Sequence, residues 1–149
     1  MAQTTTAVNA CDAAIWLDNA GGTLKDISGS SNNVDMNFDI DIGEFKSFAS
    51  KWKARITCGK DAEFTIAAVY STTTDESLDI LKNWFFAAAP GSRTLKVYLP
   101  DKNVGSDVYS GEFVLSNLKI PADGSKADFI MVEATLKPDG AVTLTTNAT

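Results

Sequence analysis

Nine consecutive residues near the start of the chain alternate strictly between apolar and polar side chains. The stretch runs from Val34 to Ile42 and reads Val-Asp-Met-Asn-Phe-Asp-Ile-Asp-Ile. A period of two residues is typical of a β-strand with one buried face and one solvated face. The polar positions are Asp35, Asn37, Asp39 and Asp41. We therefore predict a half-buried strand whose solvated face is acidic.

A second stretch, shortly after the first, repeats the alternation with the opposite charge. It alternates between basic Lys51, Lys53 and Arg55 and apolar Trp52, Ala54 and Ile56. We expect the two stretches to pair as antiparallel strands, so that unlike charges face each other. The expected register places Asp41 opposite Lys51, Asp39 opposite Lys53, Ile40 opposite Trp52 and Met36 opposite Ile56. Phosphate binding is the alternative role of the basic residues, but pairing with the acidic strand explains them more simply.

The connection between these strands is expected to be a long loop, about 42–50, and it contains two phenylalanines. Aromatic side chains such as Phe45 and Phe48 are hard to bury in the core of the same domain from a loop of this kind. One interpretation is that the loop inserts into a neighbouring subunit. The other is that both rings fold back as a lid on their own sheet. The sequence leaves both interpretations open.

One segment has the period of an amphipathic helix. Its apolar stripe consists of Leu78, Leu81, Trp84, Phe85 and Ala88. Thr73 and Glu76 match a capping box, and Pro90 with Gly91 would end the helix. We predict a helix at about 73–88 that packs this stripe against a sheet.

The other regular segments are predicted to be strands. An opening hairpin is expected from 14–17 and 24–27, because the turn between them contains Asn19 and two glycines. Further strands are expected at 63–70, after a break at 59–61, and at 93–99, 109–120, 127–136 and 141–144. The polar ends, 1–10 and 145–149, are expected to form a flexible arm and a flexible tail.

Together these elements predict a mainly β protein. We expect a β-sandwich or small barrel of two packed sheets, flanked by the single helix. The chain has 149 residues and no internal repeat or linker, so we expect a single domain, 1–149.

Composition removes several chemical functions. The sequence contains no histidine, which excludes the common catalytic triads and the usual zinc site. The segment from Asp39 to Glu44 has a superficial likeness to a calcium loop, but its glycine and its bidentate Glu do not fall at the required places. Asp39 and Asp41 lie about 7 Å apart on one strand face, as a carboxylate pair could, yet a solvated face explains them more simply. We expect no catalytic residue, no metal and no cofactor.

Charge and hydropathy limit the partners. A net charge of −6 disfavours tight binding of nucleic acid. No run of about 18 apolar residues is present, so we expect no membrane insertion. The N-terminus does not match a signal peptide, which predicts synthesis in the cytoplasm, where Cys11 and Cys58 would stay small, unpaired thiols.

Several segments resemble a known family. They are the polar N-terminal arm, the long loop between two strands, the run from Gly59 to Ile66 that leads into a single helix, and the closing segments Tyr109–Pro121 and Phe129–Leu136 with the turn Asp139-Gly140. Across nearly the whole chain these features resemble the major tail (tail tube) proteins of long, non-contractile-tailed bacteriophages. The tubes of contractile phages and of type VI secretion are similar to that family.

The resemblance implies a function and a set of partners. It implies a non-enzymatic structural protein of the virion tail, made in the host bacterial cytoplasm. Copies would assemble into hexameric rings, and the rings would stack into a tube through which double-stranded DNA passes without specific binding. A tape measure protein and tail-tip or terminator proteins would be further partners. We expect no C-terminal immunoglobulin-like domain after Thr149, which implies a smooth outer surface.

The resemblance also suggests roles for particular residues. Candidates for the lumen are Asp35, Asn37, Asp39 and Asp41. Candidates for subunit or ring interfaces are Phe45, Phe48, Lys51, Lys53, Arg55, Thr4, Thr5 and Thr6. The alternatives are another ring-forming head–tail connector or tail terminator, a ligand- or carbohydrate-binding β-sandwich that uses Trp16 and Tyr109, and a small hydrolase that uses carboxylates.

Overall fold

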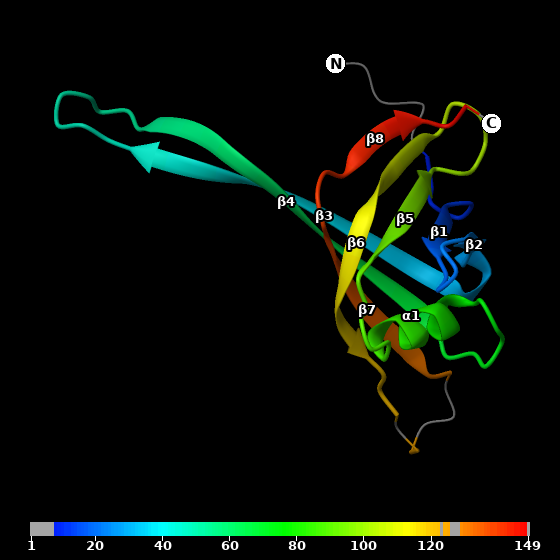
Figure 1. Ribbon diagram of the computed structural model, residues 1–149. Helices are drawn as coiled ribbons and strands as arrows, with labels where there is room; N and C mark the ends of the chain where they lie inside the picture. Colours follow the sequence, from blue (N-terminus) through cyan, green and yellow to red (C-terminus); the bar gives the residue numbers. More distant parts are fainter. Residues whose placement is uncertain (1–7, 123, 126–128, 149) are drawn as a thin grey trace.

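One long hairpin projects from the body of the molecule (Figure 1). The computed structural model describes residues 8–122, 124–125 and 129–148. Over these residues the strands are β1 (Ala14–Asp18), β2 (Leu24–Asp26), β3 (Ser31–Phe45), β4 (Ala54–Val69), β5 (Ser92–Leu99), β6 (Asp107–Lys119), β7 (Met131–Pro138) and β8 (Thr143–Thr146). The helices are α1 (Ser77–Phe85) and the short 3-10 helix η1 (Ser28–Ser30).

The strands pair antiparallel in one continuous sheet. Its order is β2-β1-β5-β6-β7-β4-β3, and β8 pairs with β6. The sheet bends so that strands distant in this order meet, as the rings of Phe38 in β3 and Tyr109 in β6 do with centroids 6.0 Å apart. The predicted mainly β sandwich with a single helix is confirmed, with both layers belonging to the same hydrogen-bonded sheet.

The core lies between the two layers and under the helix. Alternate residues of β4, among them Phe64 and Ile66, are fully buried, as expected for a strand with one inward face. The ring of Phe64 lies 4.7 Å from that of Phe113 in β6, measured between centroids. The helix contributes Leu81 and Trp84 to the same cluster. The body is therefore held by apolar packing that joins β1, β4, β5, β6 and α1.

The helix is shorter than predicted. It begins at Ser77 rather than near 73, because Asp75 has a left-handed backbone with φ of 61° and Glu76 is extended. The expected capping box does not form. The backbone N–H of Ser77 instead donates to the Ser30 hydroxyl oxygen at 3.0 Å, so η1 supplies the cap. At the other end Phe85 is exposed and Ala88 lies beyond the helix, so the predicted stripe is wrong at both residues.

The register of the long hairpin also differs from the prediction. Strands β3 and β4 are neighbours and antiparallel, but Ile40 faces Lys60 and Asp39 faces Asp61. The predicted pairing of Asp39 with Lys53 and of Asp41 with Lys51 is therefore wrong. The break expected at 59–61 lies inside β4, and the loop is 46–53 rather than 42–50. The observed register aligns the core-facing residues of both strands, and a buried face fixes register more strongly than exposed charges do.

The last residues of the chain are held in place more firmly than expected. Thr145 and Thr146 belong to β8, and Asn147 is buried. The Asn147 amide donates to the carbonyl oxygens of Lys102, at 2.8 Å, and Asn103, at 3.2 Å. A flexible tail that starts at 145 is therefore wrong for 145–147.

Two tryptophans allow a direct test of where stability originates. Trp84 is fully buried and its indole N–H donates to the Gly91 carbonyl oxygen at 3.1 Å, whereas Trp52 is 86% exposed. Trp84→Ala should lower the free energy of unfolding by about 3–5 kcal/mol, because it leaves a large cavity. Trp52→Ala should change it by less than about 0.5 kcal/mol. Urea denaturation of dilute protein measures both, and equal losses would contradict the assigned core.

Candidate assembly surfaces

The hairpin of β3 and β4 extends well beyond the body (Figure 1). From Asn37 to Asp61 every residue except Ser47 is exposed. Within the described part of the chain, β3 pairs only with β4 and forms one end of the sheet. The outer part of this hairpin, residues 37–61, therefore projects from the body, and we call it the arm. At its base, the ring of Phe38 still contacts that of Tyr109 in β6.

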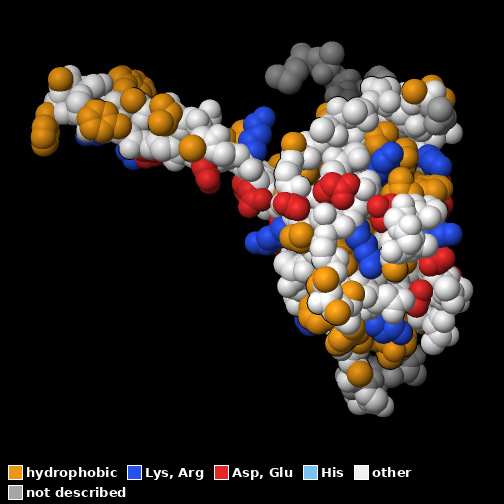
Figure 2. All heavy atoms as spheres, viewed as in Figure 1, with side chains coloured by type: hydrophobic (Ala, Val, Ile, Leu, Met, Phe, Trp, Pro, Cys, Tyr) orange, Lys and Arg blue, Asp and Glu red, His pale blue; other side chains and the backbone are white. Residues whose placement is uncertain are grey.

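The far end of the arm carries large apolar side chains that touch no core. We define the arm tip as residues 43–56. Its exposed apolar residues are Phe45, Phe48, Trp52 and Ile56. Figure 2 shows hydrophobic side chains gathered at this end. The interpretation of Phe45 and Phe48 as a lid on their own sheet is wrong, because both rings are exposed at the far end of the hairpin. Exposed apolar surface of this kind is typical of an interaction site.

The arm tip is also basic. It carries Lys46, Lys51, Lys53 and Arg55 against the single carboxylate of Glu44. Glu44 lies 3.1 Å from Lys53 Nζ and 3.0 Å from Arg55 Nε. All three side chains are about half exposed, so these pairs add little stability. The charge of the tip is thus only partly neutralised within the chain.

Nearer the body, one face of the arm is acidic. Cross-strand partners share a face, so Asp39 and Asn37 lie on the same side as their partners Asp61 and Glu63. We define the acidic face as Asp35, Asn37, Asp39, Asp41, Asp61 and Glu63. Figure 2 shows acidic side chains where the arm meets the body. Lys137 Nζ is 4.0 Å from the Glu63 carboxylate, but the expected neutralisation by Lys51 and Lys53 is wrong.

Two members of this face were missed by the sequence analysis. In β4 the exposed residues Asp61 and Glu63 alternate with the buried residues Ala62 and Phe64. The signal was present in the run Asp-Ala-Glu-Phe. It was hidden because the Gly59 region was interpreted as a break rather than as part of a strand.

An irregularity separates the acidic face from the tip. Between the pairs Ile40–Lys60 and Ile42–Thr57, β4 has one residue more than β3. Such a β-bulge bends the strand and increases its twist. Beyond it Ile56 pairs with Gly43 and covers it, since a Cβ on Gly43 would lie 3.3 Å from Ile56 Cγ1. On this side of the hairpin the surface therefore changes from acidic to apolar.

A groove lies where the arm joins the body. Its walls come from β3, β4 and the turn between β7 and β8, and its volume is about 480 Å³. The lining residues are Phe38, Asp39, Ile40, Lys60, Asp61, Ala62, Pro138, Gly140, Ala141 and Val142. We call it the root groove. Most of its lining is apolar, yet none of the residues that the structure describes fills it.

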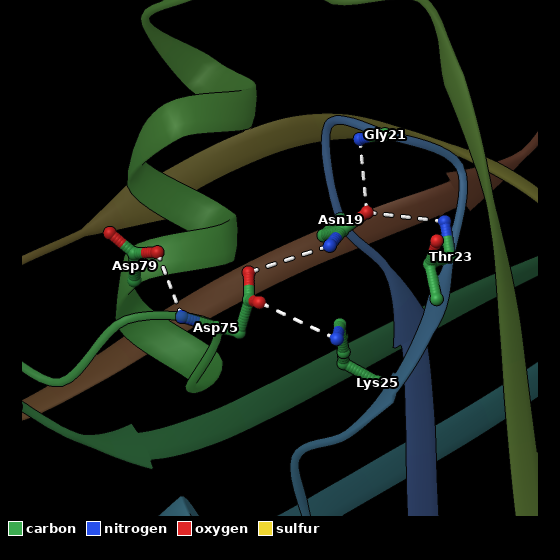
Figure 3. A network of polar contacts seen from close by, with 6 residues as sticks. All are labelled: Asn19, Gly21, Thr23, Lys25, Asp75 and Asp79. Carbon is green, nitrogen blue, oxygen red and sulfur yellow. Dashed lines mark hydrogen bonds and ion pairs between the residues drawn. The ribbon is translucent and has the colours of Figure 1, made fainter.

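A polar network at the start of α1 serves the fold (Figure 3). Asn19 accepts hydrogen bonds from the backbone N–H groups of Gly21, at 2.9 Å, and Thr23, at 3.1 Å. Lys25 Nζ lies 3.6 Å from the Asp75 carboxylate, and Asp75 N–H donates to Asp79 at 3.0 Å. Each polar group is used locally, so the network joins the opening hairpin to the helix.

The other sequence candidates are not brought together. Trp16 pairs with Lys96, whereas Val97 pairs with both Ile15 and Tyr109. Trp16 and Tyr109 therefore lie on opposite faces of the sheet and form no shared carbohydrate platform. The thiols of Cys11 and Cys58 are free and exposed. Thr4, Thr5 and Thr6 lie outside the described residues.

The described residues include no group of three or more His, Cys, Asp or Glu that could hold a metal ion. No helix in the same ranges is both long and apolar enough to cross a membrane. Among titratable groups, burial lowers the pKa of Arg93, and a hydrogen bond from Ser106 lowers the pKa of Asp101. Both shifts leave ordinary charges at neutral pH, and neither residue lies in the arm or the root groove.

Known structures share this fold. No protein-family model and no curated protein sequence matches the chain. A tail chain of an empty gene transfer agent particle, refined with C6 symmetry, is 18% identical with a TM-score of 0.68, over 97% of this chain and 99% of that chain. A sheath/tube terminator chain of the extracellular contractile injection system PVC is 13% identical, with a TM-score of 0.73 over 96% and 99%.

A third match is the SPP1 tail tube, which is 10% identical with a TM-score of 0.69 over 96% of this chain and 80% of that chain. At these identities the likeness defines the fold. The chain thus has the fold seen in subunits of phage-like tails and tubes.

The arm should be separable from the body. Ile40 and Lys60 face each other, so Asn-Gly in place of 41–59 would close a two-residue hairpin there. This replacement should change the free energy of unfolding by less than about 1 kcal/mol, because the deleted side chains are exposed. Urea denaturation of the shortened chain and of the intact chain measures this change. A body that no longer folds would contradict this division.

Proposed function

We propose that the protein is a structural subunit that assembles into stacked rings and forms the tube of a phage or phage-like tail. The observation that carries this proposal is the arm, which holds four large apolar residues that the rest of the described chain leaves exposed. Burying one such side chain contributes about 1.5–3 kcal/mol, so several together can drive association. The fold supports the proposal, because tail and tube chains share it.

In this proposal the arm makes the contacts between subunits or rings. Phe45 and Phe48 anchor it by apolar burial, and Lys51, Lys53 and Arg55 add charge that selects the orientation. Residues 1–10, with Thr4, Thr5 and Thr6, would reach a neighbouring copy. The exposed tip then has a function that folding alone does not give it.

The free edge of β3 provides a second contact. A long strand with unpaired N–H and C=O groups favours pairing with another chain. When different surfaces of two copies meet, a closed ring results if the rotation between them closes. The gene transfer agent tail has C6 symmetry, which supports six copies in each ring.

The acidic face supports the assignment of a lumen. Asp35, Asn37, Asp39 and Asp41, extended by Asp61 and Glu63, would face the channel. A wall of carboxylates repels DNA phosphates and gives passing DNA no fixed binding site. Double-stranded DNA could then move through the tube during genome delivery.

The proposal also implies where the protein is located and which partners it has. The protein would be made in the host bacterial cytoplasm and would reside in the tail of the virion. Its main partner would be itself, with a tape measure protein inside the tube and tail-tip or terminator proteins at its ends. It would have no catalytic activity.

A tube terminator is the second candidate. The PVC match is a sheath/tube terminator, and its TM-score of 0.73 exceeds the 0.68 and 0.69 of the tail and tube chains reported above. A terminator forms a cap rather than a repeating stack, so the two candidates differ in copy number. Quantitative mass spectrometry of the particle that contains the protein would give many copies per tube for the first and a single ring for the second.

Electron microscopy of the purified protein tests assembly directly. Concentrated protein should form rings or tubes, and the mass in native mass spectrometry should be a multiple of the 15.9 kDa subunit. Phe48→Ser combined with Trp52→Ser should abolish these forms without changing the thermal midpoint of the monomer, because both residues are exposed. A wild-type protein that stays monomeric at high concentration would overturn the proposal.

The lumen assignment has its own test. Asp35→Lys combined with Asn37→Lys changes charge near the body and leaves the arm tip intact. Tubes should still form. The variant tubes should bind short double-stranded DNA, and this binding should weaken as the salt concentration rises, whereas wild-type tubes should leave the DNA unbound. Cosedimentation measures binding, and electron microscopy locates the DNA. Density on the outer wall would show that the acidic face does not line the channel.

A further inference from the structure

We propose that the arm tip of one copy docks into the root groove of a second copy. This inference rests on the proposed assembly and names the contact that drives it. The groove is lined largely by apolar residues at the base of the arm, and the unpartnered apolar residues lie at its end. One molecule therefore carries both halves of the contact at opposite ends of the same hairpin.

The two halves cannot meet within a single chain. Eight residues separate Ile40, in the groove, from Phe48, at the tip, and an extended strand of that length spans roughly 27 Å. The paired strands between them hold the tip away from the groove. Docking must therefore join different copies, and each copy keeps a free groove or a free tip for the next one. Such a head-to-tail contact propagates from copy to copy.

Both surfaces at this contact are largely apolar. Phe38 and Ile40 in the groove are each 49% exposed, and Ala141 and Val142 line the opposite wall. A groove of about 480 Å³ has room for one or two aromatic side chains of the tip. Burial of Phe48 or Trp52 there would remove apolar surface of both copies from water.

Charge favours the same pairing. The tip has four basic residues and one carboxylate in a chain whose net charge is −6, so the rest of the chain is strongly acidic. Asp39 and Asp61 face each other and line the groove beside Lys60. Asp139 stands in the turn between the lining residues Pro138 and Gly140. Two opposed carboxylates repel each other, and a basic tip beside them would relieve that repulsion.

A different apolar surface fits the tip less well. Phe85 and Phe86 at the end of α1 are exposed and lie against each other, with ring centroids 5.1 Å apart. Lys82, in the last turn of the helix, adds positive charge there. A basic tip would be repelled by this surface, whereas the root groove attracts it.

Charge exchange between tip and groove tests the pairing. The tip variant carries Lys46→Glu and Lys51→Glu, at positions that make no ion pair within the described residues. The groove variant carries Asp61→Lys and Asp139→Lys. Each variant alone should need about tenfold more protein to assemble, because its tip and groove now have like charges. Light scattering against concentration measures the threshold.

Mixing the two variants should restore assembly. The acidic tip of the first then meets the basic groove of the second, and the basic tip of the second meets the acidic groove of the first. In this docking Asp39 and Asp61 lie against the tip, and Asp35, Asn37, Asp41 and Glu63 are the part of the acidic face that is left to the channel. A single chain with all four changes should assemble as well as wild type. If the wild type assembles but the mixture of the two variants does not, the docking is overturned and the proposed function is not. A wild type that does not assemble would overturn both the docking and the proposed function.

Cross-linking locates the contact independently of charge. In a Cys11→Ser and Cys58→Ser background, one protein carries Ala49→Cys, at an exposed position beside the anchor Phe48, and the other carries Ala141→Cys. Mild oxidation of the mixed assembly should join them in more than about half of the chains if the tip lies in the groove. The control partner carries Ala20→Cys, which is exposed in the turn between β1 and β2. Equal cross-linking to both partners would overturn the proposal.

Discussion

The packing of one face of β4 against the core determines the geometry of the whole molecule. Phe64 and Ile66 are fully buried, and their partners in β3 are Met36 and Val34. These apolar pairs fix the register of the hairpin, because a slip by one residue would turn both strands inside out. Once the register is set near the body, the strands stay paired, with one bulge beyond the Ile40–Lys60 pair, and carry the arm outward. The arm is thus a consequence of the core, although it does not belong to it.

This register separates the charges instead of pairing them. It places Asp39 opposite Asp61 and leaves the lysines in the tip, where only Glu44 neutralises them. Two solvated aspartates side by side cost a few tenths to about one kcal/mol, which is small beside the burial of Phe64. The core therefore decides the register against the charges. The result is a hairpin that is acidic at its base and basic at its end, with a gradient available for contact with another copy.

The sequence predicts local features well and long-range alignment poorly. Alternation located the acidic stretch of β3, since it reflects one strand and its own faces. Turn residues and apolar runs located β1, β5 and β6. It did not give the register of β3 with β4, because two alternating strands can be matched in several ways and only the buried partners distinguish them. Gly59 resembles a break by residue type, yet it lies beside a bulge in a continuous strand. The helix start failed for a similar reason, since Ser30, far away in sequence, provides the cap for Ser77.

The contrast between local pattern and long-range contact also explains why assembly surfaces are harder to infer from the sequence than a core. Alternation in β4 marks Ala62 and Phe64 as inward residues, and the fold uses them. At the tip, Phe45 and Ile56 occur on the side of the hairpin that carries the aspartates nearer the body, so their apolar character contradicts the pattern of their own strand. An apolar residue that breaks the local pattern, and that the core leaves exposed, has no role in the stability of the monomer. In the proposed assembly its contribution to free energy comes from a second molecule, and for this reason we assign the arm to an interface.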